Sequence, residues 1–481
     1  MTAPSVQTTT LREQVFIGGE WVHPQHGGER TDVIDASNAA VLGSVARGSA
    51  ADVDRAVGSA RDAFTEWSQT SPEHRATMLE SLRDALAERA EEAASLISLE
   101  VGTPTLISQR VQVGLPLQTL QGFADAARHH PWEECVGPTL VLREPAGVVG
   151  AITPWNYPLH QLVGKVGAAL AAGCTVVAKP ADVAPLSTFL LAEACEAAGL
   201  PAGVFNLVTG PGREVGEALA GHPGIDVLSF TGSTTVGARV AALAAANITR
   251  VTLELGGKSA SVLLDDADLP RAVKASVNNA FLNSGQTCSA WTRLVVPRER
   301  QAEVLGMAEA AAAKLTLGHP LAEGTRLGPL ASAAQQRTVR DYIELGISEG
   351  ATLVTGGSGA PADLTEGFYV TPTVFGDVDR SARIAQEEIF GPVLCVIPHD
   401  GDEDAIAIAN DSAYGLAGAV WSADEERGMA AVRRIRTGQM DLDGARFNPF
   451  SPFGGYKQSG IGREFGNIGI DEFVEIKGVQ R

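Results

Sequence analysis

Short apolar runs that alternate with Ala-rich segments of helical length constrain the fold of this chain more than any other feature. The runs fall at 147–152, 175–178, 204–208, 227–230, 251–253 and 262–264. Such runs are typical of strands buried on both faces, and their alternation with helices indicates βαβ units in a parallel sheet covered on both sides. Because ligands of such a sheet bind at the carboxyl ends of its strands, a site is expected there.

A second alternating stretch begins near Lys258 and predicts a second α/β domain. Its expected elements are a helix around 302–314 and strands at 294–296, 370–374 and 393–397. Ahead of the first stretch, apolar residues at helical spacing predict two covering helices. One spans 49–67, with Ser49 as N-cap, and the other runs from 71 through 97 and stops before Gly102 and Pro104. Segments 139–143 and 473–479 read as further strands. The predicted fold class is therefore α/β, with two open parallel-sheet domains and a small additional β element.

Composition excludes several classes of partner. The 481 residues carry 37 Lys+Arg against 57 Asp+Glu, a net charge of −20, and 44% are hydrophobic, which is typical of a globular protein of two or three domains. An acidic chain is not expected to bind nucleic acid or an anionic membrane surface. The longest apolar stretch, 166–178, is too short to span a bilayer, and residues 1–14 lack the pattern of a targeting signal, so a cytoplasmic location is expected.

The five cysteines indicate neither a disulfide framework nor a metal site. They are odd in number, scattered and without CxxC spacing, so free thiols are expected and no metal is predicted. The five are Cys135, Cys174, Cys195, Cys288 and Cys395.

Two loops carry the strongest candidates for chemistry. The small-residue loop 284–289 presents Cys288, whose small neighbours allow close approach of a substrate to the thiol. Glu254 ends the apolar run 251–253 and is followed by two glycines, a position where partial desolvation makes a carboxylate a usable general base. Taken alone, each has a plain alternative: a lone cysteine is usually a buried small hydrophobe, and such a glutamate often only bonds a turn.

Other strand ends offer candidates for binding a dinucleotide and for stabilising an oxyanion. The segment 210–216 follows a strand but has GxGxxxG spacing, one residue longer than the usual fingerprint. The segment 230–237 ends a strand and opens a helix whose free N–H groups suit a pyrophosphate. Lys179 and Asp182 place a cation and a carboxylate at a third strand end, and Asn156, between two prolines, offers an amide donor at a fixed place.

Taken in order, these segments resemble the aldehyde dehydrogenase superfamily over nearly the whole chain. The matching strings are PWNYP at 154–158, KPAD at 179–182, FTGS at 230–233, ELGGKS at 254–259, GQTC at 285–288, EEIFGPV at 387–393 and PFGGYKQSGIGRE at 452–464. The resemblance implies oxidation of an aldehyde to a carboxylic acid with NAD(P), through a cysteine thiohemiacetal and a thioester that water hydrolyses.

The resemblance also implies a division of the chain. Its parts are an NAD-binding domain of residues 1–125 and 147–257, a catalytic domain of 258–442, an oligomerisation sheet of 126–146 and 474–481, and a return segment of 443–473. The family is usually dimeric or tetrameric, so a homodimer or homotetramer is expected.

Catalytic roles carry over by motif. Cys288 corresponds to the nucleophile, Asn156 to the side chain that holds the oxyanion, and Glu254 to the base that activates water. Lys165 and Glu464 match positions that support this base.

Cofactor contacts carry over in the same way, and NAD is the predicted cofactor. The matching positions are Ile152, Thr153, Pro154, Trp155, Lys179, Asp182, Gly212, Phe230, Thr231, Gly232, Ser233, Leu255, Gly256, Glu388 and Phe390. Many members have Glu where this chain has Asp182. A carboxylate there bonds ribose hydroxyls and repels a 2′-phosphate, but Asp is shorter by one methylene, so NADP is not excluded.

Three alternatives and the substrate stay open at this point. A CoA-acylating dehydrogenase would need CoA for turnover, although acylating members generally lack the base that Glu254 supplies. A thioesterase or amidase would act without NAD, and a non-catalytic binding or structural member would form no NADH. The residues in segments that line the aldehyde tunnel of relatives, Tyr157, Gln161, Phe447 and Phe453, suit aliphatic, aromatic and semialdehyde substrates alike.

Overall fold

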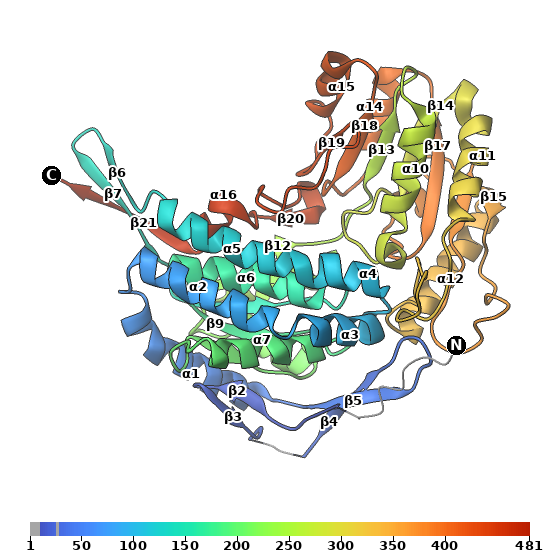
Figure 1. Cartoon of the computed structure of the whole chain (residues 1–481). Helices are drawn as coiled ribbons and strands as arrows, with labels where there is room; N and C mark the ends of the chain where they lie inside the picture. The colour runs from blue at the N-terminus through green and yellow to red at the C-terminus, as the bar shows by residue number, and fades with distance from the viewer. Residues whose placement is uncertain (1–9, 26–27) are drawn as a thin grey trace.

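The computed structural model describes residues 10–25 and 28–481, which build two large sheets and two small ones (Figure 1). The first sheet has eight strands in the order β20-β12-β11-β8-β9-β10-β2-β3. Their bounds are Gly460–Ile461, Arg250–Glu254, Val227–Thr231, Val148–Ile152, Thr175–Lys179, Phe205–Leu207, Val15–Ile17 and Glu20–Val22. The five strands from β12 to β10 are parallel, and the strands outside them are antiparallel.

Alternate residues of the central strands of the first sheet enter two separate cores. Val149 and Ala151 of β8 pack in the core under α2, α3, α5, α6 and α7, whereas Val148 and Ile152 pack in the core under α1, α8 and α9. The bounds of these helices are Pro72–Ala87, Ala90–Val101, Gly114–His129, Pro158–Ala172, Leu186–Ala197, Ala50–Trp67, Glu217–Ala220 and Thr234–Ala245. Because successive side chains of a strand point to opposite faces, both faces of the sheet are buried, which explains why its strands are mainly apolar and do not alternate with polar residues.

The second sheet has seven strands in the order β15-β16-β17-β14-β13-β18-β19, and all but β15 are parallel. The bounds are Thr352–Thr355, Thr373–Gly376, Val393–His399, Arg293–Pro297, Ala260–Leu263, Gly418–Trp421 and Asp441–Leu442. Helices α10 (Leu269–Ala280) and α11 (Gln301–Ala312) pack with one core of this sheet. The other core contains residues of α12 (Ala333–Ser348), α13 (Arg383–Gln386), α14 (Asp402–Asn410) and α15 (Glu425–Val432).

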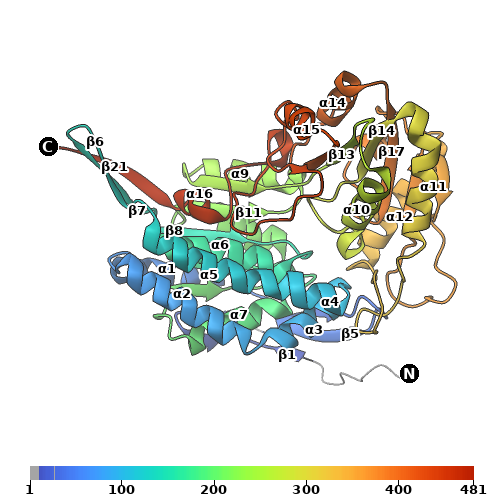
Figure 2. The same ribbon diagram turned by 45° about the horizontal axis from the view of Figure 1, so that its top comes forward.

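A three-stranded antiparallel sheet projects from the body of the molecule, with the C-terminus at its free end (Figures 1 and 2). Its order is β21-β7-β6, and the bounds are Val474–Gln480, Thr139–Pro145 and Glu133–Val136. We call it the projecting sheet. A second small sheet, β1-β5-β4, lies near the start of the described chain and comprises Thr10–Arg12, Val41–Ala46 and Arg30–Ile34.

Most predicted elements are present, and two expectations were wrong. The expected strand near 370–374 is displaced to β16, and the single helix expected over 71–97 is two helices, α2 and α3, because the backbone leaves the helical conformation at Arg89 (ψ 8°). The short strands β1 to β5 were not predicted, since they lack a periodic pattern of their own. Ser49 is the N-cap of α1, and its N–H donates to the Asp52 carboxylate at 3.0 Å.

Within the described residues, none of the helices is long and apolar enough to cross a membrane. In the same part of the chain, no group of three or more His, Cys, Asp or Glu side chains is placed to hold a metal ion.

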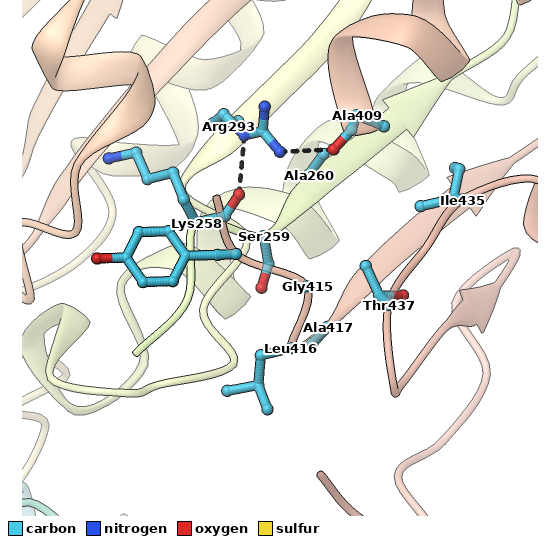
Figure 3. A pocket seen from close by; sticks show the side chains of 11 residues that line it. Lys258, Ser259, Ala260, Arg293, Ala409, Gly415, Leu416, Ala417, Ile435 and Thr437 are labelled. Carbon is cyan, nitrogen blue, oxygen red and sulfur yellow. Dashed lines mark hydrogen bonds between the residues drawn. The ribbon is translucent and has the colours of Figure 1, made fainter. Parts of the chain in front are cut away.

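A buried arginine joins the start of the second sheet to a neighbouring helix. Arg293, the first residue of β14, lies beside a small cavity with Lys258 and Ser259 (Figure 3). Its guanidinium donates to the carbonyl oxygens of Lys258, Ile408 and Ala409 at 2.8, 2.7 and 2.8 Å. Burial lowers the pKa of Arg293 to about 10, so the group stays charged at neutral pH. The segment that leaves the first sheet is thereby held to the end of α14.

Replacement of this arginine should cost considerable stability. Arg293→Leu leaves the buried carbonyl oxygens of Lys258 and Ala409 without the guanidinium donor, and that of Ile408 with only the Asp411 N–H at 3.3 Å. We therefore expect the free energy of unfolding to fall by about 3–5 kcal/mol, measured by urea titration. The control is Arg298→Leu, because Arg298 pairs with Asp400 at 2.7 Å with both side chains more than half exposed, and its loss should leave the midpoint unchanged. Equal midpoints for the two variants would contradict the structural role of Arg293.

Candidate active site

The carboxyl ends of the parallel strands form a crevice where the direction of strand order changes. The chain passes from β8 outward through β9 to β10, and then returns to place β11 and β12 on the other side of β8. Connections from β8 and β11 therefore leave in opposite directions, which opens a crevice between them. Thr153 to Asn156 follow β8, and Gly232 and Ser233 follow β11, so the two predicted loops meet there.

Side chains at the ends of β9 and β11 suit a dinucleotide. Lys179 ends β9 and is buried, and its Nζ lies 3.2 Å from Asp182 Oδ1. Burial lowers the pKa of Lys179, while Asp182 acts in the opposite direction. Ser233 is the N-cap of the twelve-residue helix α9, whose first N–H groups face the crevice end of β11.

Glycines let the backbone pack closely against neighbouring side chains at these strand ends. A Cβ on Gly232 would lie 2.5 Å from the Phe230 ring, and one on Gly256 would lie 2.1 Å from the Glu388 carboxylate. Gly212 opens the short turn 212–216 with nothing within 4 Å of where its Cβ would be. Thr153 Oγ1 is buried without a hydrogen-bond partner among the described residues. This cradle fits the predicted NAD.

The second half of the molecule supplies the other wall. Glu388 lies between α13 and β17 and accepts a hydrogen bond from the Gly257 N–H at 3.0 Å; burial raises its pKa to about 7. Phe390 has a left-handed backbone (φ 57°), and its ring meets the Trp155 ring edge-on, with the centroids 5.4 Å apart. Trp155 follows β8 of the first sheet, so these aromatic rings join the two halves at the predicted cofactor site.

Of the remaining predicted cofactor positions, Ile152 and Thr231 end strands of the first sheet, and Leu255 follows a third. Leu255 is buried against α9, where a Cβ on Gly237 would lie 2.4 Å from it. Pro154 lies in the loop after β8. All the predicted cofactor positions except Glu388 and Phe390 therefore lie at or just beyond the carboxyl ends of the parallel strands.

The loop that carries Cys288 has an unusual backbone. Asn283, Ser284 and Gly285 are consecutive left-handed residues, with φ of 53°, 57° and 74°. A Cβ at position 285 would lie 2.1 Å from the carbonyl oxygen of Gly391, so only glycine fits. Left-handed residues other than glycine cost about 1–3 kcal/mol each and persist only where their surroundings hold them.

Buried polar side chains hold this loop in place. Thr103 Oγ1 donates to the Asn283 side chain at 2.6 Å, and Ser284 Oγ donates to the Gly328 carbonyl at 2.8 Å. The Gln286 side chain accepts from the Ala331 N–H at 2.9 Å and donates to the Asn283 carbonyl at 3.2 Å. Cys288 is thus presented from a rigid, strained support.

Asn156 lies against the same loop. Its Nδ2 donates to the Gln286 carbonyl at 2.9 Å, which uses one N–H of the amide and leaves the other to hold a developing negative charge. Its backbone carbonyl accepts from Gln112 Nε2 at 2.8 Å and from Asn283 Nδ2 at 3.1 Å. Asn156 is therefore buried and fixed at both its backbone and its side chain.

Glu254 is a buried carboxylate with no partner. It ends β12 with 4% of its surface exposed, and neither carboxylate oxygen has a hydrogen-bond partner among the described residues. Burial raises its pKa well above the usual range, and the nearby Glu464 carboxylate raises it further. A raised pKa makes the carboxylate a stronger proton acceptor, as a general base requires.

Lys165 and Glu464 form the predicted support of this base. The Lys165 ammonium donates to the Glu464 carboxylate and, at 2.7 Å, to Thr231 Oγ1. Both charged side chains are buried, and together they act on Glu254 in opposite directions: Glu464 raises its pKa and Lys165 lowers it.

Cys288 is close to this carboxylate and shares a cavity with the predicted substrate residues. A Cβ on Gly257, three residues after Glu254, would lie 2.6 Å from the Cys288 carbonyl oxygen. Burial raises the pKa of the Cys288 thiol, and the carboxylates of Glu254 and Glu388 raise it further, so the resting group is a neutral thiol. The thiol opens on a cavity of about 360 Å³, which Tyr157, Gln161, Phe447 and Phe453 also line.

The structure adds residues that the sequence did not indicate. Gln112 and Asn283 hold Asn156, but isolated amides give no pattern that a single sequence would reveal. Gln286 stands in the string GQTC, but its contact with the Asn156 side chain was not predicted. Lys258 is buried, and its Nζ has no hydrogen-bond partner among the described residues; its charge lowers the pKa of Glu388. Its place in the string ELGGKS was the only signal.

Strand ends that suit a dinucleotide, together with a thiol that opens on a cavity and a buried carboxylate, are typical of an oxidoreductase with a reactive cysteine. Comparison with known proteins makes the class specific. The model of the aldehyde dehydrogenase family matches residues 21–479, and the chain belongs to this family.

Individual relatives agree with this assignment. A 3-succinoylsemialdehyde-pyridine dehydrogenase from a Pseudomonas species is 46% identical over 97% of this chain and 98% of its own length. Aldehyde dehydrogenase C of Pseudomonas syringae, a mutant solved with NAD+ and octanal, has a TM-score of 0.96 and 48% identity over 97% of this chain and 96% of that one. An aldehyde dehydrogenase of Mycobacterium tuberculosis, solved with NAD+, has a TM-score of 0.96 and 44% identity over 98% and 99%.

These comparisons confirm the predicted family, the α/β fold class and the enzyme class, an NAD-dependent aldehyde dehydrogenase. The roles of single residues, the functional division into domains, the assembly and the cytoplasmic location stay predictions.

Proposed function

We propose that Cys288, Glu254 and Asn156 convert an aldehyde to a carboxylic acid in the cavity in front of the thiol. The observation that carries this proposal is the buried Glu254 carboxylate. It has no hydrogen-bond partner among the described residues, and it lies close enough to Cys288 to raise the pKa of the thiol. A buried, unpaired charge destabilises the fold unless it binds a ligand or a proton, so such a group is a candidate for function.

The first step forms a bond between Cys288 Sγ and the aldehyde carbon, while the thiol proton passes to Glu254. The remaining N–H of the Asn156 amide and the Cys288 backbone N–H hold the oxyanion of the thiohemiacetal. NAD, when bound, supplies the acceptor of the hydride whose removal gives a thioester. Glu254 releases the thiol proton to solvent and then takes a proton from water as the water oxygen bonds to the thioester carbon. The C–S bond breaks, and Glu254 returns this proton to the Cys288 sulfur, so the acid and the free thiol are released.

The cofactor positions are proposed on the same basis. Lys179 and Asp182 would hold the adenosine ribose, the start of α9 and Gly212 the pyrophosphate, and Glu388 with Phe390 the nicotinamide end. Asp182 is the residue that favours NAD over NADP.

Relatives and cavity together support an aldehyde with an aliphatic chain or an aromatic ring. The structure of the Pseudomonas syringae enzyme contains octanal, and the Pseudomonas relative is named for a pyridine-bearing semialdehyde. The cavity is lined with Leu115, Leu282, Trp291, Phe447, Phe453 and Phe465 in addition to its polar residues. Such a lining suits an apolar substrate body.

The projecting sheet supports the predicted homodimer or homotetramer. Its outer strand β6 is exposed along its whole length, and Val136 and Ile476 are 61% and 70% exposed. Unpaired strand edges with exposed apolar side chains are suited to pairing with a second copy. The number of subunits stays a prediction.

An NADH-formation assay over a panel of aldehydes, run with NAD and with NADP and without CoA, tests this function. We expect turnover with NAD that does not need CoA. The variant Asp182→Ser should shift the ratio of kcat/KM for NADP to that for NAD by about tenfold towards NADP, because it removes the negative charge that repels the 2′-phosphate. The exposed Asp62→Ser is the control and should leave the ratio unchanged. A requirement for CoA, or no NADH with any aldehyde, would contradict the proposal.

A further inference from the structure

The cavity in front of Cys288 contains one carboxylate that the proposed reaction does not use. Asp441 starts β19, pairs with Ala419 of β18 in the second sheet, and lines the cavity together with Cys288. Among the lining residues, all within the described chain, it is the one acidic side chain and none is Lys or Arg. The charge at this wall is therefore negative and not balanced within the cavity.

The neighbours of Asp441 do not neutralise it. In the described part of the chain, no side chain donates a hydrogen bond to its carboxylate or forms an ion pair with it, and the nearby Gln439 amide donates to the Pro452 carbonyl instead. His160, which also lines the cavity, is buried and stacked on Phe465, and burial lowers its pKa to about 4. His160 is thus uncharged at neutral pH.

Burial raises the pKa of Asp441 to about 6, with no neighbouring charge adding to the effect. The group is still ionised at pH 8. An ionised carboxylate on a partly buried wall repels a like charge and attracts a positive one more strongly than it would in bulk water.

We propose that Asp441 is a specificity-determining residue that excludes aldehydes with a distal carboxylate and favours those whose distal end is an ammonium group. The inference rests on the proposed function, because it assigns the chemistry of the substrate to the same cavity. The Asp441 charge would distinguish aldehydes with a carboxylate from cationic and neutral aldehydes, a distinction that the apolar lining alone would not make.

The test compares kcat/KM at pH 8 for three chains of similar length: heptanal, 6-aminohexanal and 6-oxohexanoate. In the wild type we expect 6-oxohexanoate to be the poorest substrate, about tenfold or more below heptanal. Asp441→Asn should raise its kcat/KM about tenfold, lower that of 6-aminohexanal by a similar factor, and leave heptanal nearly unchanged. Asp441→Ser should give the same pattern, which guards against a folding defect specific to one variant.

Asp443→Asn is the matched control. It removes the same charge two residues away, but Asp443 pairs with Arg271 at 2.8 Å and does not line the cavity. Its substrate ratios should equal those of the wild type. Unchanged ratios in both Asp441 variants, or the same shift in Asp443→Asn, would overturn the proposal.

A binding measurement separates this proposal from the proposed function. Trp291 lines the cavity, so quenching of tryptophan fluorescence can follow the binding of hexylammonium and hexanoate, which do not react. The wild type should bind hexylammonium about tenfold more tightly than hexanoate, and Asp441→Asn should lose this preference. If no aldehyde yields NADH but the preference is present, only the proposed function fails; if turnover is normal and the preference is absent, only this inference fails.

Discussion

Replacement of Cys288 by alanine is expected to reduce the rate of NADH formation by at least about 10⁴-fold with every aldehyde. Among the described residues that line the cavity, Cys288 carries the one thiol, and the Glu254 carboxylate raises its pKa. Without the adduct there is no thiohemiacetal to oxidise. A steady-state assay at 340 nm over a range of aldehyde concentrations measures the loss.

Two further variants make the result specific. Cys135→Ala changes an exposed thiol on the projecting sheet and should keep full activity. Cys288→Ser keeps the size of the side chain but is a much weaker nucleophile, so its activity should also be severely reduced. A Cys288→Ala protein that still reduces NAD at more than a few per cent of the wild-type rate would rule out the covalent route.

The sheets were predictable because their strands are buried on both faces. The runs between 148 and 254 are mainly apolar and lie between helices, a pattern that few other structures would produce. The strands β2 and β3 were not predictable, although β2 is fully buried, because a strand of three residues has too little pattern. The pairing of β2 with β10 also joins residues far apart in the chain. The break between α2 and α3 was missed because no Gly or Pro marks it.

The sequence predicted the residues proposed to react, but not the residues that hold them in place. Cys288, Glu254 and Asn156 each stand in a recognisable string, and the structure brings the loops that carry them together. The left-handed backbone at Asn283 and Ser284 follows from tertiary bonds to Thr103 and Gly328, which no local pattern encodes. The charge of Asp441 in the cavity likewise depends on how β19 pairs with β18.

Replacement of Glu254 by glutamine should separate the two halves of the reaction. The amide cannot accept a proton from water, so we expect steady-state turnover to fall by about 10²–10⁴-fold, the usual contribution of a general base. If the thiol proton can leave by another route, the thioester still forms, and rapid mixing should show a burst of about one NADH per active site before the slow steady state.

The pH dependence follows from the raised pKa of Glu254. The protonated carboxyl cannot act as a base, so activity should be low at acidic pH and rise as Glu254 loses its proton. Glu464→Gln removes the negative charge that raises this pKa and leaves the Lys165 charge that lowers it, so the rise should move to lower pH. Exposed Glu475→Gln should leave the profile in place. An unmoved profile in Glu464→Gln would contradict the assigned charge coupling.

A nucleophile that needs no base can show which step of the reaction is slow in Glu254→Gln. Hydroxylamine attacks a thioester directly, so it should restore much of the steady-state rate if the variant stalls with the acyl group on Cys288. It cannot help if the stall precedes the thioester. A burst with rescue therefore assigns Glu254 to hydrolysis. Loss of the burst without rescue would instead place its main role in taking the proton from the Cys288 thiol, and full steady-state activity would exclude Glu254 as the base.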